Sequence, residues 1–209
     1  MRAAAIVPAY NEESTVAKVL EVLVTVPEID EVILVNDGST DRTSEIAASI
    51  PGVRVIDLPE NRGKAYAMLK GARSTDAEVL VYFDADLIGL KPEHVIALLE
   101  PVLKQEVAMT YGVFTDGRWL TDLAQKVTPS LSGQRAMIRE IMDNCENLED
   151  AGYGVEVAIS RYVKRHNLPQ KRVGLLDVSH VIKEEKLGFV QGSAQRLRMY
   201  WEIMRSLRP

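Results

Sequence analysis

The chain has 209 residues, a formal net charge of −5, 46% apolar residues and 26% charged residues. These values are typical of one ordinary folded domain; they exclude an extensively disordered chain and argue against a general nucleic-acid-binding protein, whose surface would carry a basic excess. The one cysteine, Cys145, excludes an internal disulfide framework and a cysteine-rich zinc site. No apolar run approaches the roughly 18 residues of a membrane-spanning helix, so we expect a cytoplasmic protein without a transmembrane segment.

Short apolar runs alternate along the chain with longer stretches of helical periodicity. The pattern predicts strands at 3–10, 31–36, 53–58, 78–84, 107–114 and 172–178, and helices at 14–26, 40–50, 64–73, 92–104, 134–145, 155–166 and 193–207. Strands that alternate with helices and lack period-2 polarity favour an α/β fold with a mostly parallel sheet covered on both faces. Because ligands of such sheets bind beyond the carboxyl ends of the strands, the residues that follow each strand are the first candidates for function.

The run VLVYFDADLIGL at 79–90 ends an apolar strand with two aspartates one residue apart, Asp84 and Asp86. In an extended chain residues i and i+2 point to the same face, roughly 6 to 7 Å apart. Two such carboxylates repel by roughly 2 to 3 kcal/mol at an effective dielectric near 20, whereas a divalent metal ion turns the repulsion into attraction. Taken alone, the pair is more simply a strand that ends at a solvated loop.

Three further strand ends carry polar groups. In VPAYNEE we expect Pro8 to end the first strand and Asn11 to cap the next helix. In VNDGSTD, Asp37 follows the second strand, where it can accept hydrogen bonds from a base or a ribose. In ENRGKAYAM, Lys64 begins a helix, where a cation opposes the helix dipole and a bound anion would explain it. The P-loop and dinucleotide-binding glycine patterns are both absent.

The motifs VPAYNEE, VNDGSTD, NRGKAYAM and DADL, in this order, resemble those of the nucleotide-sugar-dependent glycosyltransferases of the GT-A fold, the family-2 type in particular. The resemblance implies a single GT-A domain over 1–209, with a nucleotide-sugar-binding half at 1–115, an acceptor half at 116–192 and an amphipathic helix at 193–209. It also implies a nucleotide sugar such as a UDP-sugar as donor, and Mg²⁺ or Mn²⁺ as cofactor. The donor-binding residues that it implies are Pro8, Tyr10, Glu12, Asp37, Lys64, Asp84, Ala85 and Asp86.

The second half resembles one subgroup, the glucosyl-3-phosphoglycerate synthase-like enzymes, through DADLIG, DGRWLTD, LSGQRA, GYGVEVA and the histidine of DVSH. In that subgroup the second aspartate of the D-x-D and the late histidine hold the metal, which implies Asp86 and His180. The catalytic residues implied are Glu156, Asp86 and Lys64, with Glu156 either orienting a substrate or acting as general base. The acceptor-binding residues implied are Arg118, Thr121, Gly133, Gln134, Arg135, Tyr153 and Glu156.

The chain departs from the subgroup at two positions. Gln134 stands where the subgroup usually carries a glutamate, and Ile182 stands where it carries an asparagine. Because an apolar side chain donates no hydrogen bond, the resemblance does not establish 3-phosphoglycerate as the acceptor, although the arginines favour a small anionic one. Family-2 enzymes usually invert the anomeric centre and the subgroup retains it, so the stereochemical outcome stays open.

The last predicted helix carries an apolar stripe among arginines, made by Leu197, Tyr200, Trp201, Met204 and Leu207. The stripe favours packing in a homodimer; the alternative is peripheral membrane contact, which would suit a polyprenyl-phosphate acceptor. A third interpretation is a noncatalytic nucleotide-sugar-binding module, which predicts binding without turnover. A sugar nucleotidyltransferase is disfavoured, because the first strand is not followed by a glycine-rich basic loop.

Overall fold

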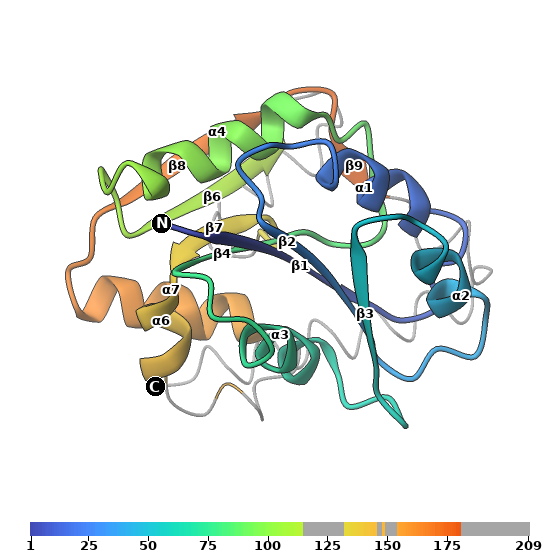
Figure 1. The fold of residues 1–209 in the computed structure, drawn as a ribbon. Coiled ribbons are helices and arrows are strands. Elements are labelled where there is room, and N and C mark those ends of the chain that lie inside the picture. The colour runs from blue at the N-terminus through green and yellow to red at the C-terminus, as the bar shows by residue number, and fades with distance from the viewer. Residues whose placement is uncertain (115–131, 146–147, 149–153, 181–209) are drawn as a thin grey trace.

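The structure, a computed structural model, describes residues 1–114, 132–145, 148 and 154–180. In this part of the chain a seven-stranded central sheet has the strand order β3-β2-β1-β4-β7-β6-β8 (Figure 1). Its strands are β1 (Ala3–Ala9), β2 (Glu31–Asn36), β3 (Val53–Asp57), β4 (Val79–Tyr82), β6 (Met109–Phe114), β7 (Arg135–Ile138) and β8 (Gln170–Leu175). Two short strands, β5 (Leu87–Ile88) and β9 (Ser179–His180), pair as a second sheet.

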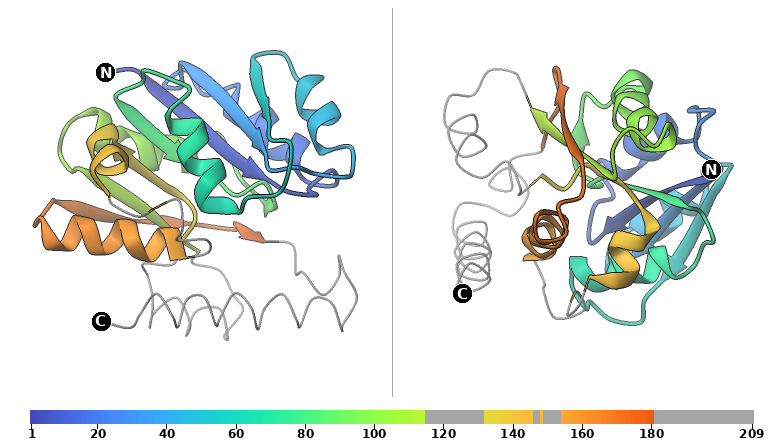
Figure 2. Two further views of the ribbon diagram at one scale, coloured as in Figure 1. Left: turned by 90° about the horizontal axis from the view of Figure 1, so that it is seen from below. Right: turned by 90° about the vertical axis from the view of Figure 1, so that its left-hand side faces the viewer.

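Helices cover both faces of the central sheet (Figures 1 and 2). One face carries α1 (Val16–Leu23), α2 (Thr43–Ala48) and α4 (Pro92–Leu103), and the other carries α3 (Lys64–Ala72), α6 (Arg139–Asn144) and α7 (Val155–Arg165). Along β1, Val7 belongs to the apolar core on the α1 side and Ile6 to the core on the α3 side, and both are fully buried. A strand buried on both faces needs apolar residues at every position, which explains the continuous apolar runs of the sequence.

Most neighbouring strands of the central sheet are parallel. β3, β2, β1 and β4 pair in parallel, as do β6 and β8, whereas β7 runs antiparallel between β4 and β6. The mostly parallel sheet predicted from the sequence is therefore confirmed. Because β7 is reversed, its amino end lies at the same edge as the carboxyl ends of β1, β2, β4 and β6, and we call this edge the rim.

The connection from β1 to α1 differs from the prediction. β1 continues through Pro8 to Ala9, so the prediction that Pro8 ends the strand is wrong. Pairing between β1 and β4 stops at Ile6, two residues before Pro8. A backbone N–H at Pro8 would point toward β4, where it would have no partner, so the proline costs the sheet no hydrogen bond. The prediction that Asn11 caps α1 is also wrong, because its Oδ1 accepts a hydrogen bond from the Thr40 N–H at 2.9 Å instead.

The segment predicted as one helix at 134–145 forms a strand followed by a short helix. Residues Arg135–Ile138 form β7 and only Arg139–Asn144 form α6. The segment pairs with β4 on one side and β6 on the other, and this sheet pairing overrides a local helical pattern. The structure also adds β5 and β9, which the sequence pattern did not predict.

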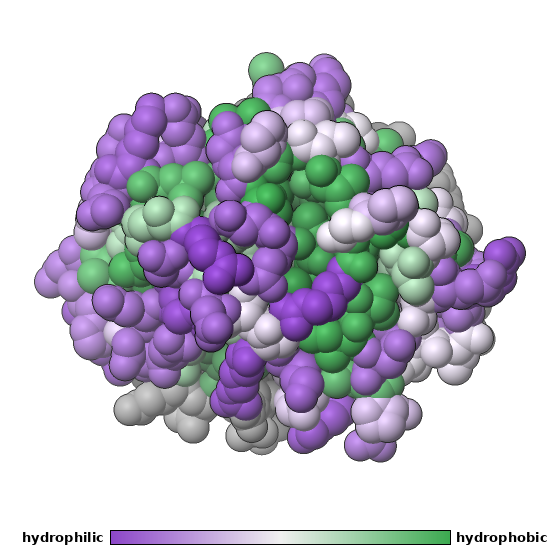
Figure 3. Space-filling view, in the orientation of Figure 1, coloured by the Kyte–Doolittle hydropathy of each residue, from purple (hydrophilic) through white to green (hydrophobic). Residues whose placement is uncertain are grey.

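The other described elements lie near their predicted ranges. β8 begins at Gln170 and ends at Leu175, and Asp177, with a φ of 58°, turns the chain into β9. The face shown in Figure 3 is largely hydrophilic at its periphery, with apolar surface between the polar side chains. Within the described residues, no helix has the length and apolar composition needed to cross a bilayer. The predicted division into halves at 115 and the helix at 193–207 fall at or outside the limits of the described residues and stay predictions.

Candidate functional site

The rim carries an ion-pair cluster built from three distant parts of the chain. Nζ of Lys64, the first residue of α3, lies 2.6 Å from Oδ1 of Asp84 and 2.6 Å from Oε1 of Glu156. Asp84 follows β4 and Glu156 is in the first turn of α7. The side chains of Lys64, Asp84 and Glu156 are 20%, 18% and 7% exposed, so salt screens these charges much less than it would at the surface.

The two carboxylates decide the charge state of Lys64. Burial alone favours the neutral amine and lowers the pKa of Lys64, but the negative charges of Asp84 and Glu156 outweigh it and raise that pKa well above its ordinary value. Lys64 is therefore charged at any physiological pH. The same carboxylates compensate for the unfavourable position of a cation at a helix start, so a bound anion is not required to explain it.

The turn before β7 holds Asp84 from the other side. Nε2 of the fully buried Gln134 donates a hydrogen bond to Oδ2 of Asp84 at 2.8 Å. A Cβ at Gly133 would lie 2.3 Å from the same oxygen, so only glycine allows the turn to approach the carboxylate this closely. The structure thus places Gly133 and Gln134 against Asp84, where the sequence assigned them to the acceptor.

Arg135 requires a correction. The sequence predicts that its guanidinium grips an anionic acceptor, but the side chain is 0% exposed. Its Nη1 donates to the backbone oxygen of Glu156 at 3.2 Å, and its Nε donates to that of Ser132 at 3.1 Å. Burial lowers the pKa of Arg135, and the carboxylates of Glu156 and Asp84 oppose that effect. A side chain enclosed in this way organises the site and does not contact a ligand from solvent.

Asp37 holds the loop that leads into α3. Its carboxylate accepts hydrogen bonds from the backbone N–H groups of Arg62 and Gly63, each at 2.8 Å. A Cβ at the next residue, Gly38, would lie 2.5 Å from the backbone of Glu60, and φ there is +69°, so glycine is required. Each carboxylate oxygen keeps a second lone pair, and the predicted contact of Asp37 with a base or ribose stays open.

The other predicted donor-binding residues at the end of β1 lie at the same rim. Pro8 is half-buried, and Tyr10 is exposed by 43%. Glu12 is also half-buried, and its Oε2 accepts a hydrogen bond from Oγ1 of Thr15 at 3.1 Å. The exposed ring of Tyr10 is thus available to a ligand at this edge.

The segments of the predicted metal ligands come together in the second sheet. Asp86 is half-buried in the turn between β4 and β5, and Ala85 beside it is buried. The pairing of β5 with β9 sets the backbone of His180 opposite that of Leu87, the residue after Asp86. Across the described side chains, no group of three or more His, Cys, Asp and Glu residues could hold a metal ion. Metal binding by Asp86 and His180 stays a prediction that this register supports.

Three predicted acceptor residues, Arg118, Thr121 and Tyr153, lie outside the described residues. Conversely, the sequence reasoning did not single out Ser132 and Arg62, whose backbone groups bind Arg135 and Asp37. Contacts made through backbone atoms leave no residue-type pattern that could have revealed them.

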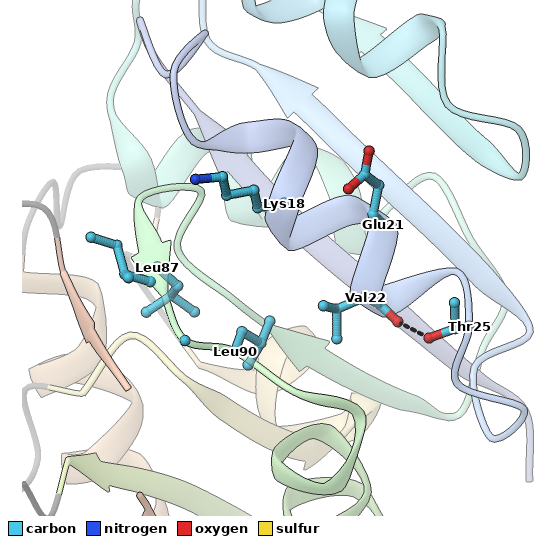
Figure 4. A pocket seen from close by; sticks show the side chains of 8 residues that line it. Lys18, Glu21, Val22, Thr25, Leu87 and Leu90 are labelled. Atoms are coloured by element: carbon cyan, nitrogen blue, oxygen red, sulfur yellow. Dashed lines mark hydrogen bonds between the residues drawn. The ribbon is translucent and has the colours of Figure 1, made fainter. Parts of the chain in front are cut away.

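A cavity of about 360 Å³ lies apart from the cluster, between α1 and the β5 segment (Figure 4). It is lined by Lys18, Glu21, Val22 and Thr25 on one side and by Leu87, Ile88, Gly89 and Leu90 on the other. None of these is a predicted site residue. Functional sites gather buried charged groups with perturbed pKa values, so the cluster around Lys64, whose pKa is raised by its two carboxylate partners, is the stronger candidate.

Comparison with known proteins identifies the family of the chain. The family model described as "Glycosyl transferase family 2" matches residues 4–162. Glucosyl-3-phosphoglycerate synthase of Mycobacterium tuberculosis (strain H37Rv) is 29% identical over 191 residues, which cover 74% of this chain and 58% of the synthase. The synthase of Mycolicibacterium smegmatis is 28% identical over 188 residues, covering 74% of this chain and 61% of the synthase. The chain thus spans about 60% of the length of these relatives.

Solved structures show the same fold. The M. tuberculosis synthase in complex with phosphoglyceric acid has a TM-score of 0.77 at 26% identity, covering 100% of this chain and 81% of that one. Its complex with Mn²⁺, UDP-glucose and phosphoglyceric acid has a TM-score of 0.76 at 26% identity, covering 98% and 79%. The expected GT-A fold is confirmed, and the family model spans most of the chain. The chain belongs to glycosyl transferase family 2.

Proposed function

We propose that the chain is a metal-dependent glycosyltransferase that moves a sugar from a UDP-glucose-like donor to a small anionic acceptor such as a phosphoglycerate. The observation that carries the proposal is the cluster of Lys64, Asp84 and Glu156 at the carboxyl edge of a mostly parallel sheet, where ligands of such sheets bind. Solved relatives that are 26% identical hold Mn²⁺, UDP-glucose and phosphoglyceric acid, which supports the donor, the metal and the acceptor class.

The contacts of Lys64 argue for a divalent cation beside it. Lys64 already shares its single charge between two carboxylates, so it reaches a diphosphate only by giving up one of these contacts. Asp86 and His180 would supply a carboxylate and an imidazole, ligands that Mn²⁺ accepts, and a two-residue site leaves positions for oxygens of the donor. When bound, the metal would supply positive charge to the departing diphosphate.

Each candidate site residue would then have its own role. Asp37, with Tyr10 and Glu12 on the neighbouring loop, would hold the nucleoside. Asp84, fixed by Lys64 and Gln134, would orient ribose or sugar hydroxyls. Glu156 would orient the acceptor or take its proton as general base. An anionic acceptor would bind Arg118 and Thr121, because Arg135 is enclosed.

Calorimetric titration of the metal-free protein with UDP and GDP, with and without Mn²⁺, tests the donor site. We expect Mn²⁺-dependent binding of UDP that is lost in Asp86→Ala and kept in Asp76→Ala, a matched control at an exposed aspartate away from the rim. Binding of neither nucleotide under any condition would overturn the proposal.

A turnover assay separates the remaining possibilities. We expect UDP release from UDP-glucose to depend on 3-phosphoglycerate or a similar acid. Tight UDP binding without turnover of any donor would instead support a noncatalytic module, and turnover only with polyprenyl phosphate in vesicles would support the membrane alternative. The homodimer stays a prediction, because the helix expected to form it lies outside the described residues.

A further inference from the structure

The enclosed guanidinium of Arg135 connects the helix that carries Glu156 with the turn whose Gln134 binds Asp84. On one side it donates to the backbone oxygen of Ser132 through Nε at 3.1 Å and also through Nη2. On the other side Nη1 donates to the backbone oxygen of Glu156 at 3.2 Å. We propose that Arg135 is a positioning residue for sugar transfer, which sets the separation of Asp84 and Glu156 so that Lys64 bridges both. The catalytic part of this inference rests on the proposed function.

A continuous path of hydrogen bonds runs from Arg135 to Asp84. Ser132, whose backbone oxygen binds Arg135, donates through Oγ to Oε1 of Gln134 at 3.3 Å. This contact orients the amide of Gln134 so that Nε2 points to Asp84, 2.8 Å away. Moving Ser132 would therefore turn the amide and release one oxygen of Asp84.

The second path from Arg135 reaches Glu156 through the helix that carries it. The backbone oxygen of Glu156 also accepts a hydrogen bond from Oγ of Ser160 at 2.7 Å, so Arg135 binds the first turn of α7 at a carbonyl that is already fixed. Three planar donors on one rigid group can bind two separate carbonyls in this way, whereas the single ammonium of a lysine cannot reproduce the geometry.

Charge supports the same role. Lys64 and Arg135 carry two positive charges, and Asp84 and Glu156 carry two negative ones, so the group is neutral as a whole. Removing one charge from a buried, paired set leaves the others uncompensated. Loss of Arg135 would remove one of the positive charges that act on the two carboxylates and favour their separation.

Arg139 offers a matched control four residues along the chain. Its guanidinium also ties backbone carbonyls together, donating to Ala77 at 2.7 Å, Ala72 at 3.0 Å and Thr75 at 2.7 Å. These residues lie at the opposite end of β4 and include no candidate site residue. Arg139→Met therefore removes a comparable set of structural contacts without touching the cluster.

The first test does not depend on any substrate. In a ¹H–¹⁵N spectrum of the ligand-free protein, a shielded and ion-paired lysine ammonium exchanges slowly with water and is visible. We expect the Lys64 signal, assigned with Lys64→Met, in the wild type and in Arg139→Met, and its loss in Arg135→Met. An unchanged signal in Arg135→Met would overturn the inference even if the proposed function held.

The second test is kinetic and uses temperatures at which each variant is folded. A displacement near 1 Å at a reacting group costs on the order of 100-fold in rate, so we expect Arg135→Met to lower kcat by about 100-fold and KM for the donor to change much less. Arg139→Met should leave both constants unchanged. If Arg135→Met does not fold, Arg135→Lys replaces it in this test. Lysine keeps the positive charge but lacks the planar set of donors, so Arg135→Lys should also lower kcat.

A double-mutant cycle checks that Arg135 acts through Glu156. Because Arg135 is proposed to act through the bridge that Lys64 makes between Asp84 and Glu156, Arg135→Met should cost less in the background of Glu156→Gln, where that ion pair is already lost, than it costs in the wild type. Fully additive losses in kcat would show that Arg135 acts independently of Glu156 and would contradict the inference.

Discussion

Replacing Lys64 by methionine tests whether the ion-pair cluster holds the rim together. The change keeps most of the side-chain volume and removes the ammonium that lies 2.6 Å from both Asp84 and Glu156. The two carboxylate oxygens then face each other at no more than about 5 Å, where two like charges repel by about 3 kcal/mol at an effective dielectric near 20. Removing one partner of a buried ion pair costs a similar 3 to 5 kcal/mol. We therefore expect Lys64→Met to lower the free energy of unfolding by about 3 kcal/mol.

Urea unfolding near pH 8 measures this loss as a lower midpoint with an unchanged slope. Lys104→Met is the control, because Lys104 pairs with Glu100 on the exposed surface of α4, where such a pair contributes little. The double variant Lys64→Met/Glu156→Gln removes the repulsion and should be more stable than Lys64→Met alone. A loss no larger than that of the control, or no recovery in the double variant, would refute the electrostatic reasoning.

Three other substitutions probe neighbouring contacts. Asp37→Ala removes the carboxylate that accepts the backbone N–H groups of Arg62 and Gly63. We expect the free energy of unfolding to fall by about 1 to 3 kcal/mol and UDP binding, measured by calorimetry, to weaken. Unchanged UDP binding would show that this loop plays no part in the donor site. Gly133→Ala brings a Cβ to 2.3 Å from Asp84, so the turn must shift; thermal melting should show a lower Tm, and a Tm equal to that of the wild type would mean that the turn moves freely. Tyr82→Phe removes a buried hydroxyl that has no hydrogen-bond partner in the described part of the chain. Because an unsatisfied buried polar group costs about 1 to 3 kcal/mol, urea unfolding should find the variant at least as stable as the wild type. A clear loss of stability would reveal a partner for the hydroxyl.

The first half of the fold is readable from the sequence because β1, β2 and β4 are buried on both faces and the helices between the strands have an apolar face. Leu20 and Leu23 mark the buried face of α1 in the sequence and are fully buried in the structure. The reversed strand β7 is not readable in this way. Its four residues are too few to show a period, and only its pairing with β4 and β6 makes it a strand.

Some site residues could be predicted from the sequence and others could not. Lys64, Asp84 and Glu156 are carried by recognisable motifs, and the structure brings them together. The role of Arg135 could not be predicted, because a sequence pattern does not distinguish an arginine that faces solvent from one whose donors all bind inside the protein. The segment at Ser132 and the first turn of α7 enclose it, and neither contact can be read from the sequence.

The reversal of β7 has a consequence for how this scaffold could be altered. β6 ends at the rim with Phe114, and β7 begins there with Arg135. The connection between them therefore leaves and re-enters the sheet on the side of the candidate site, whatever its length. Under the proposed function, a variant library confined to residues 115–131 therefore tests whether this connection selects the acceptor.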